Sequence, residues 1–226
     1  MLLCGKIRDT NLNLCLYGDN LMEKKIDIEQ YKILQEIYDY FNHHLFSDFS
    51  LPEIIFTIDY RRSNNTGFFH AEKFDHKGKK ISVISLNPDH FDRSNIDCMS
   101  TIAHEMSHLW EYCISPDKYK GGYHTKVWSS KMQKIGLMPS DTGQEGGKKT
   151  GRRMTHYIVK NGLFEQKANE FISNHQNIFL FSGIAMIQKV SDKKKNKIKY
   201  TCPCGQNVWG KPALQIICGE CKQYFA

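Results

Sequence analysis

Two histidines and one glutamate form the most informative cluster of reactive side chains in this sequence. His104 and His108 stand four residues apart, and Glu105 directly follows the first of them. Residues four apart on a helix lie on the same face, so both imidazoles can reach one metal ion. This H-E-x-x-H spacing is typical of zinc sites at which the glutamate acts on a metal-activated water molecule. With this composition, on the order of 0.02 such matches are expected by chance.

Helical geometry separates these histidines from the apolar residues of the same segment. At about 100° of rotation per residue, His108 lies about 40° from His104. The opposite side of the helix carries the apolar side chains, namely Met99, Ile102, Ala103, Met106, Leu109, Trp110 and Cys113. The pattern therefore argues against histidines packed in a core. A solvated polar face is the remaining alternative, but it does not explain why a carboxylate stands between two imidazoles one turn apart.

A third ligand is expected because a catalytic zinc ion commonly has three protein ligands and one open position. The metzincin continuation of the motif, which adds a third histidine, is absent from residues 104–114. Further along, Gly121 and Gly122 allow a close turn before His124, which begins a helix predicted over 124–135. We therefore predict His124 as the third ligand. The other histidines lack such a setting and are interpreted as surface or incidental residues: His43, His44, His70, His76, His90, His156 and His175.

Four of the eight cysteines form two pairs near the end of the sequence, Cys202-Pro-Cys204 and Cys218-Gly-Glu-Cys221. This clustering favours metal ligation over a disulfide framework. Four thiolates satisfy a tetrahedral zinc ion without an open position, so the pairs predict a structural zinc ribbon. The first pair is C-x-C where the common ribbon has C-x-x-C, and a vestigial or three-ligand ribbon is the alternative.

Hydrophobic periodicity predicts the elements that must position these groups. Ser94 and Asp97 form a capping box at the start of the helix that carries the histidines. The predicted elements are helices over 27–46, 94–113, 124–135 and 163–172 and strands over 53–60, 67–74 and 80–86. The glycine-rich, basic segment 143–153 predicts a mobile surface loop. It is not a P-loop, because Lys149 stands where that motif requires Ser or Thr.

The composition is that of an ordinary folded protein: 226 residues, 40% hydrophobic and 24% charged, with a formal net charge of +7. This length accommodates one good-sized core and a small appendage, and the composition excludes a disordered chain. The longest apolar stretch, 178–187, is interrupted and far shorter than the ~20 residues of a membrane-spanning helix. Residues 1–6 carry no export signal. We therefore expect a cytoplasmic protein without a membrane partner, nucleoid-associated if prokaryotic.

In the order of these features the chain resembles the Spartan-related, SprT-like family of zinc metallopeptidases. The shared features are an initial helix, a small sheet ending in Leu86-Asn87-Pro88, the H-E-x-x-H motif, His124 with Trp128, and a cysteine ribbon. The resemblance implies an α+β fold with a zincin-like core, in which a small sheet packs with the helices that carry the motif. The lysine-rich segment 189–199 predicts a basic linker between a metallopeptidase domain over 1–188 and a zinc ribbon over 200–226.

The same resemblance implies two zinc ions, one catalytic and one structural. His104, His108 and His124 would hold the catalytic ion, and Glu105 would act as the general base of peptide-bond hydrolysis. Cys202, Cys204, Cys218 and Cys221 would hold the structural ion. The sequence does not identify the residue that stabilises the oxyanion. The candidates are Tyr123, His156 and Arg152, and the alternative for each is a residue that is merely nearby or unrelated.

For the substrate, the resemblance implies proteins bound or crosslinked to DNA, and the net positive charge favours an acidic partner. The predicted contacts to single-stranded or crosslinked DNA are Lys148, Lys149, Arg152, Arg153 and Trp209. The alternative for these residues is a solvated loop and a packed tryptophan. Two other functions stay open: a non-catalytic, zinc-stabilised DNA-binding or scaffold protein, and a zinc peptidase that does not bind DNA.

Overall fold

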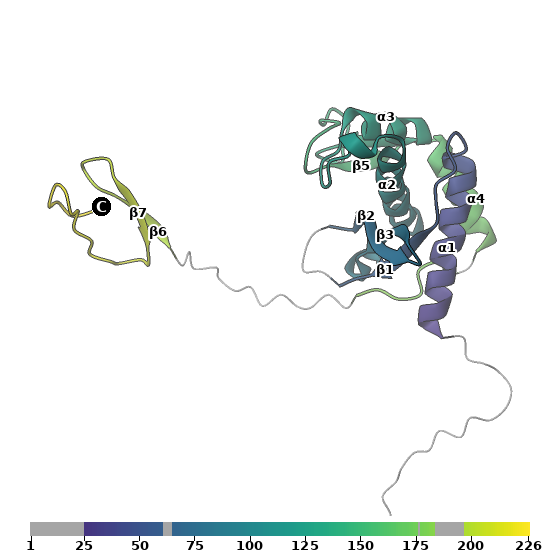
Figure 1. Cartoon of the computed structure of the whole chain (residues 1–226), viewed down its shortest axis with the longest axis horizontal. Coiled ribbons are helices and arrows are strands. Elements are labelled where there is room, and N and C mark those ends of the chain that lie inside the picture. Colours follow the sequence, from purple (N-terminus) through teal and green to yellow (C-terminus); the bar gives the residue numbers. More distant parts are fainter. Residues whose placement is uncertain (1–24, 61–64, 176, 184–196) are drawn as a thin grey trace, which may run out of the picture. The chain divides into compact units, whose positions relative to one another are not determined.

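The computed structural model describes residues 25–60, 65–175, 177–183 and 197–226. The chain divides into two compact units, Met1–Gly183 and Ile184–Ala226, which we describe separately. In the described residues, the first unit contains four helices and two small sheets, and the second contains a two-stranded sheet (Figure 1). This mixed helix and sheet content agrees with the predicted fold class. The predicted boundary at residue 188 and most of the predicted linker lie outside the described residues.

A three-stranded mixed sheet supports one side of the first unit. Strands β1 (Ile54–Ile58), β2 (Gly67–His76) and β3 (Lys79–Leu86) lie in the order β1-β3-β2, with β1 parallel and β2 antiparallel to β3. Because β3 is central, its residues 81–86 are buried, and its β-branched side chains suit that position. The strands agree with the predicted ranges to within two residues at each end.

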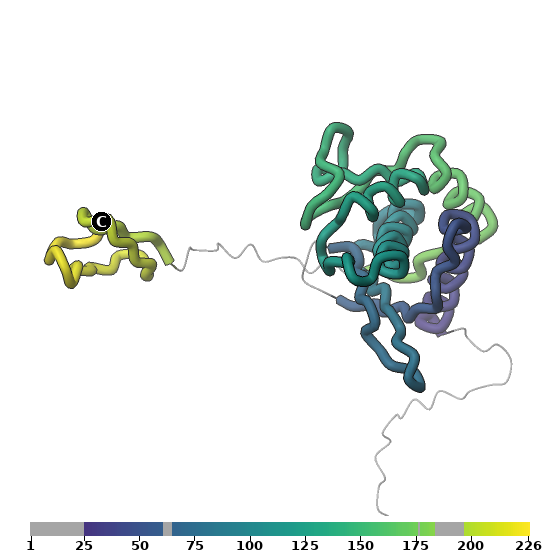
Figure 2. Tube along the Cα trace, turned by 45° about the horizontal axis from the view of Figure 1, so that its top comes forward, coloured from purple at the N-terminus to yellow at the C-terminus, as the bar shows by residue number. Residues whose placement is uncertain are grey.

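Helix α2 (Asn95–Ile114) runs through the middle of the first unit, with the other three helices packed around it (Figure 2). It begins as predicted, because the side-chain oxygen of Ser94 accepts a hydrogen bond from the backbone N–H of Asp97. Its apolar face lies in the hydrophobic core. Its histidine face is buried as well, so the helix is enclosed on nearly all sides and is not an ordinary amphipathic surface helix.

Helix α1 (Ile26–Leu45) buries a polar side chain in its first turns and leaves two apolar ones exposed. Ile28 and Tyr31 are 62% and 40% exposed, whereas Gln30 is fully buried. The Gln30 amide donates to the carbonyl of Ile178 and accepts from the N–H of Leu180. A buried polar side chain is tolerated there because both ends of its amide are hydrogen-bonded. The apolar residues that recur at helical spacing further along α1 are buried, namely Leu34, Ile37, Tyr38 and Phe41.

Helix α3 (Lys126–Ile135) ends at Gly136, which has a left-handed φ of 92°. A Cβ at this position would lie 3.0 Å from the backbone nitrogen of Leu163, at the start of α4 (Leu163–Asn174). Only glycine combines this conformation with so close an approach. The chain turns directly into a hairpin of β4 (Leu137–Ser140) and β5 (Thr155–Ile158). Sequence periodicity missed this hairpin because each strand has only four residues.

The segment between β4 and β5 contains the predicted basic surface loop. Most of its side chains are exposed, but its backbone is fastened at both ends. The Asp141 N–H donates to the Lys148 carbonyl at 3.0 Å, and the Lys148 N–H donates to the Asp141 carboxylate at 2.8 Å. At the other end, Gly151 forms a two-bond bridge with His124. The loop therefore has a defined course beside the histidine cluster.

A buried lysine connects α3 to the end of α1. The Lys131 side chain is 1% exposed, and its Nζ contacts the Asp48 carboxylate at 2.6 Å and the Leu45 carbonyl at 3.2 Å. Burial of the Asp48 carboxyl disfavours its ionised form, but hydrogen bonds from Lys131 and Lys134 outweigh this effect and hold the pKa of Asp48 at about 2. The ionised carboxylate is therefore favoured by folding.

We expect Asp48→Asn to destabilise the first unit in a pH-dependent way. A carboxyl whose pKa is lower in the folded state stabilises the protein above its unfolded pKa of about 3.9, and this contribution is lost as the pH falls toward 2. The difference in the free energy of unfolding between wild type and variant should thus be largest above about pH 5 and shrink toward pH 2. Denaturant titrations of both metal-free proteins across this range measure it.

Asp75→Asn is the matched control, because the Asp75–Lys80 pair is about half exposed on both sides and exposed pairs contribute little. A loss of stability in Asp48→Asn that stays constant from pH 6 to pH 2 would contradict the assignment.

The described part of the second unit is small and has few buried side chains. Its strands β6 (Ile198–Thr201) and β7 (Asn207–Gly210) pair antiparallel. The buried side chains are Tyr200, Cys202 and Cys218. The Tyr200 hydroxyl donates to the Lys211 carbonyl at 2.7 Å and accepts from the Leu214 N–H at 2.9 Å. In the described parts of both units, no helix is both long and apolar enough to cross a membrane.

Candidate metal centre and surrounding cavity

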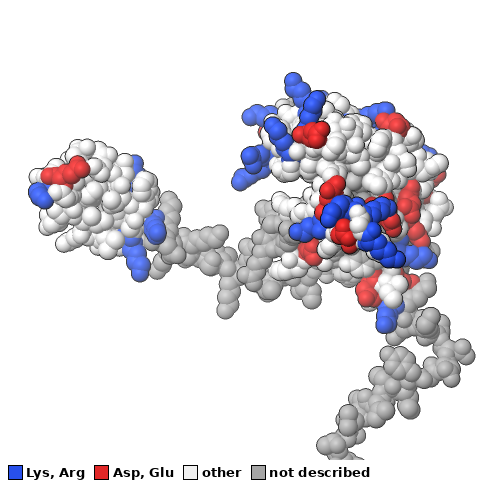
Figure 3. All heavy atoms as spheres, viewed as in Figure 1, with Lys and Arg blue, Asp and Glu red and all other residues white. Residues whose placement is uncertain are grey.

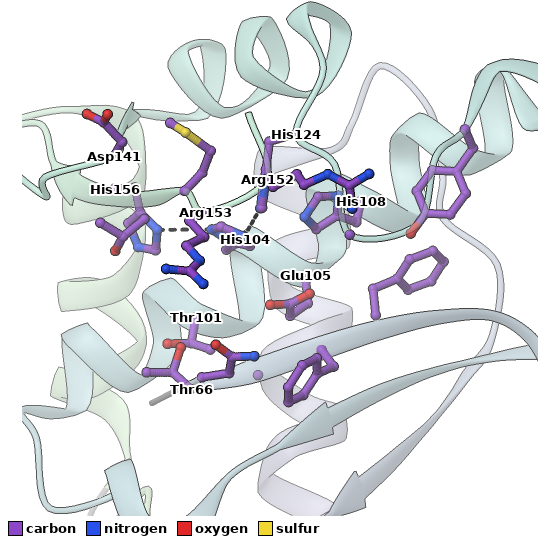
Figure 4. A pocket seen from close by; sticks show the side chains of 18 residues that line it. Thr66, Thr101, His104, Glu105, His108, His124, Asp141, Arg152, Arg153 and His156 are labelled. Atoms are coloured by element: carbon purple, nitrogen blue, oxygen red, sulfur yellow. Dashed lines mark hydrogen bonds between the residues drawn. The ribbon is translucent and has the colours of Figure 1, made fainter. Parts of the chain in front are cut away.

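His104 and His108 project from the same side of α2, with ring centroids 5.2 Å apart (Figure 4). Their exposed fractions are only 8% and 6%. They are nevertheless not enclosed by the core on all sides, since both line a cavity of about 730 Å³. The sequence argument that they oppose the core face is therefore consistent with the structure, although the opposing face is covered rather than solvated.

His124 joins this pair from a different segment. Its Nε2 lies 3.1 Å from Nε2 of His104, and its ring centroid lies 4.6 Å from that of His108. The prediction that His124 begins a helix is wrong, because α3 starts at Lys126 with Thr125 as its N-cap. The imidazole is instead oriented by the backbone bridge to Gly151 and by a 3.0 Å hydrogen bond from its Nδ1 to the Gly151 carbonyl.

Trp128 of α3 supports all three imidazoles. Its side chain is fully buried; its ring stacks on that of His108 at 5.2 Å and meets those of His104 and His124 edge-on at 4.8 and 4.4 Å. The rings thus rest on one rigid aromatic surface, which limits their rotamers and keeps the three nitrogens close together. This contact gives a structural role to the tryptophan four residues after His124.

The distances and donor atoms fit a zinc ion. The Gly151 carbonyl can only accept, so the His124 proton lies on Nδ1 and the lone pair lies on Nε2, facing His104. Two nitrogens bound to one tetrahedral zinc at about 2.0–2.1 Å are roughly 3.3 Å apart, close to the 3.1 Å between Nε2 of His104 and Nε2 of His124. The potential ligand atoms of all three histidines lie within 4.8 Å of one another. Three imidazoles are a donor set that zinc commonly accepts.

Burial keeps these imidazoles in the neutral form that binds metal. Desolvation lowers the pKa of His104, and the neighbouring imidazoles lower it further. Desolvation lowers the pKa of His108 and of His124 as well, against a smaller opposing effect of the Gly151 carbonyl on His124. Since protonated histidine cannot bind zinc, these lowered pKa values make the cluster suited to a cation at neutral pH.

Glu105 lies on the cavity wall beside the histidines (Figure 4). Its carboxylate accepts a hydrogen bond from the backbone N–H of Phe69 on the edge strand β2; burial raises its pKa to about 8, and this hydrogen bond acts in the opposite direction. A dication on the adjacent histidines would lower that pKa again, because an opposite charge nearby favours the ionised form. The edge strand approaches closely because Gly67 has no side chain: a Cβ there would lie 2.9 Å from Thr101 and 3.3 Å from Glu105.

Two of the four predicted basic loop residues also line this cavity. Arg152 and Arg153 extend into it from the segment before β5 (Figure 4). Lys148 and Lys149 are exposed and do not line it, and Lys149 donates to the side-chain oxygen of Gln133 at 3.0 Å. The structure thus divides the set: the two arginines line the cavity that Glu105 also lines, and the two lysines of the same loop do not.

Sequence reasoning missed the contact between His156 and the histidine cluster. His156 was interpreted as incidental, with a role at the oxyanion as the alternative, but its Nδ1 lies 3.1 Å from Nδ1 of His104 and its Nε2 lies 2.9 Å from the Ser100 hydroxyl. With both ring nitrogens engaged, it is a poor candidate for an oxyanion donor. Of the other two candidates, Arg152 lines the cavity and Tyr123 does not, whereas the unpredicted Tyr119 does. Burial and the nearby Glu105 carboxylate raise the pKa of Tyr119.

A second cluster of potential metal ligands lies in the second unit. The sulfur atom of Cys202 is 3.2 Å from those of Cys204 and Cys221, and the Cys204 and Cys218 sulfurs are 3.7 Å apart. Sulfurs sharing one tetrahedral zinc at about 2.3 Å are roughly 3.8 Å apart. Backbone N–H groups of Cys221 and Glu220 lower the pKa of Cys218 to about 7, which favours the thiolate. Despite the unusual C-x-C pair, all four cysteines converge.

Trp209 also lies in the second unit, on β7 opposite Lys199 of β6. Its side chain is 63% exposed. The alternative interpretation, a packed tryptophan, is therefore wrong.

The comparison with protein families agrees with this geometry. The model of the SprT-like family matches residues 34–149, which is just over half of the chain and includes α2 and His124. The protein therefore belongs to the SprT-like family, a class of zinc-peptidase-like proteins. No curated protein matches the sequence. No solved structure matches it either.

Proposed function

We propose that this protein is a zinc-dependent endopeptidase that hydrolyses peptide bonds, with a zincin-like core, and that its substrates are proteins bound or crosslinked to DNA. One observation carries the peptidase assignment: Glu105 stands beside three converging imidazoles on the wall of a cavity of about 730 Å³. Membership of the SprT-like family supports the same assignment. The DNA part rests on the resemblance and on the exposed basic and aromatic side chains.

In this proposal His104, His108 and His124 hold zinc, which when bound polarises the scissile carbonyl and lowers the pKa of a water molecule. Glu105 takes a proton from the attacking water and delivers it to the leaving amine. The Phe69 N–H fixes the carboxylate for this transfer. Arg152 and Arg153 offer positive charge to the oxygen that becomes negative during the reaction, where preorganised charge is most effective.

The competing function is a non-catalytic scaffold in which the histidine cluster binds metal only for stability. A structural zinc site normally has four protein ligands and no open position. Three imidazoles beside a buried carboxylate on a cavity wall fit that description poorly. The three histidines and Glu105 therefore fit a peptidase better than a structural metal site.

The decisive experiment incubates the purified protein with a DNA-binding protein substrate, with and without single-stranded DNA and with and without a chelator. The proposal expects cleavage that the chelator abolishes and that DNA stimulates. Chelator-sensitive cleavage that DNA does not affect would support the peptidase assignment and contradict the proposal that the substrates are bound to DNA. No cleavage under any condition, with zinc bound at the histidines, would favour the scaffold.

DNA binding is expected to weaken steeply with salt. Lys and Arg side chains gather at the end of the first unit that carries α3 and the β4–β5 loop (Figure 3), where Lys148 and Lys149 are exposed. With single-stranded DNA, each phosphate contact contributes about 0.7 to the slope of log K against log salt. Replacing Lys148 and Lys149 with alanine should therefore reduce that slope by about 1.4, measured by fluorescence anisotropy with single-stranded DNA.

The matched control is the double alanine variant of Lys79 and Lys80, which removes the same charge from two lysines whose ion pairs are exposed, on a different part of the first unit. It should leave the slope nearly unchanged. Trp209→Ala should weaken binding without changing the slope, since stacking is not electrostatic. Equal effects of both lysine pairs would mean that net charge, and not this loop, attracts DNA.

A further inference from the structure

His104 is the start of a chain of hydrogen bonds that leads away from the cavity. Its Nδ1 lies 3.1 Å from Nδ1 of His156, which β5 contributes. Nε2 of His156 lies 2.9 Å from the Ser100 hydroxyl, and that hydroxyl donates at 2.7 Å to the carbonyl of Asp97. The dashed line between the two imidazoles in Figure 4 marks the first of these contacts.

The direction of this chain follows from its last member. A backbone carbonyl can only accept, and a serine hydroxyl has one proton. Because the Ser100 hydroxyl donates its proton to the Asp97 carbonyl, its oxygen must accept a hydrogen bond from Nε2–H of His156. A neutral imidazole has a single ring proton, so Nδ1 of His156 is an acceptor. The His104 proton then lies on Nδ1, and Nε2 of His104 keeps a free lone pair.

That lone pair points at His124. Nε2 of His124 is also without a proton, since its Nδ1 donates to the Gly151 carbonyl, and the two Nε2 atoms lie 3.1 Å apart. Two lone pairs at this separation repel unless a cation lies between them. The reverse direction of the chain would place a proton between the two nitrogens, but Ser100 would then have to give up its bond to Asp97.

We infer that His156, supported by Ser100, is a positioning residue for the metal: it fixes the tautomer and ring orientation of His104 so that Nε2 faces the ion. This inference rests on the metal site of the proposed function. Among the described residues, it identifies the one side-chain hydrogen bond that orients a histidine of the cluster and that a substitution can remove. His124 is oriented by a backbone carbonyl, and Nδ1 of His108 has no hydrogen-bond partner among the described residues.

The test measures zinc affinity in the full chain by competition with chelators of graded strength. His156→Leu removes the acceptor for His104 and should weaken zinc binding at the histidine site by about 10–100-fold, the usual effect of losing such a partner. His156→Asn retains an acceptor close to the position of Nδ1 and should recover most of the affinity. Ser100→Ala, which removes only the outer contact, should have a smaller effect in the same direction.

The cysteine site of the same molecules serves as an internal standard, and its zinc affinity should be equal in all variants. His175→Leu is the control for losing an imidazole elsewhere, because His175 packs against Phe171 at the end of α4, outside the cavity. In zinc-loaded wild type, nitrogen NMR should find the His104 proton on Nδ1.

Two results would overturn the inference. One is a zinc affinity of the histidine site in His156→Leu within threefold of that in wild type. The other is an equal loss of zinc affinity in His156→Leu and His156→Asn. The second would mean that the volume of the ring, and not its hydrogen bond, matters. If His156→Leu does not fold, the zinc affinities of His156→Asn and Ser100→Ala test the inference without it. A wild type that binds zinc only at the cysteines would instead refute the metal site of the proposed function.

Discussion

Replacing Glu105 with glutamine is expected to reduce peptide-bond hydrolysis by about 10²–10⁴-fold, the usual contribution of a general base. Glutamine has the same shape and can still accept the hydrogen bond from Phe69, but it cannot take a proton from water. Folding should not suffer, because the variant removes a carboxylate whose burial already disfavours its charge. Initial rates on a DNA-binding substrate at saturating zinc measure the effect.

The zinc content of the Glu105→Gln protein must equal that of wild type, because a loss of zinc would also lower the rate and would not test the general base. Glu145→Gln is the matched control, because Glu145 is exposed on the β4–β5 loop and does not line the cavity. It should retain full activity. Undiminished hydrolysis by Glu105→Gln with full zinc occupancy would reject Glu105 as the base.

The second unit is expected to depend on its metal for folding. Its described part buries few side chains, while Trp209, Ile217 and Tyr224 are 63%, 55% and 61% exposed. So small a core supplies little stability, whereas zinc binding stabilises zinc-finger peptides by about 10–16 kcal/mol. Cys204→Ser should therefore release one zinc ion per chain and remove hydrogen-exchange protection from residues 197–226. Metal analysis and exchange mass spectrometry measure both effects.

Cys204 is the informative choice because it belongs to the unusual C-x-C pair and is the exposed member of the cluster. Full zinc content and protection in Cys204→Ser would mean that the ribbon uses three ligands. Cys113→Ser makes the same chemical change in α2, outside both clusters. It should keep both zinc ions, and the thermal unfolding of the first unit should be unchanged in Cys204→Ser.

Most of the first unit could be predicted from local patterns. The helices and the three strands of the mixed sheet follow from periodicities of a few residues, which the sequence displays directly. The hairpin of β4 and β5 was missed because four-residue strands give too short a pattern. The burial of Gln30 at the start of α1 has no local signal, because it depends on a hydrogen bond to the distant Ile178.

The candidate site was also predicted only where its residues follow a local pattern. His104, Glu105 and His108 belong to one helix, so their spacing alone places them together. His124 was predicted as a partner, but through a helix that starts two residues too early; a bridge to Gly151 orients it instead. The separation of the two loop arginines from the two loop lysines has no local signal at all.

The sequence by itself determined the chemistry available to this protein: two helical imidazoles with a carboxylate between them, and two close cysteine pairs. Short-range backbone geometry converts such spacings into shared faces and turns. Only the tertiary structure decided which distant groups complete the site, including His156, which lies 52 residues from His104 in the sequence. Such contacts depend on how whole helices and strands pack. The free energy that brings two distant residues together comes from the packing of the entire core, so neither residue shows it in the local sequence.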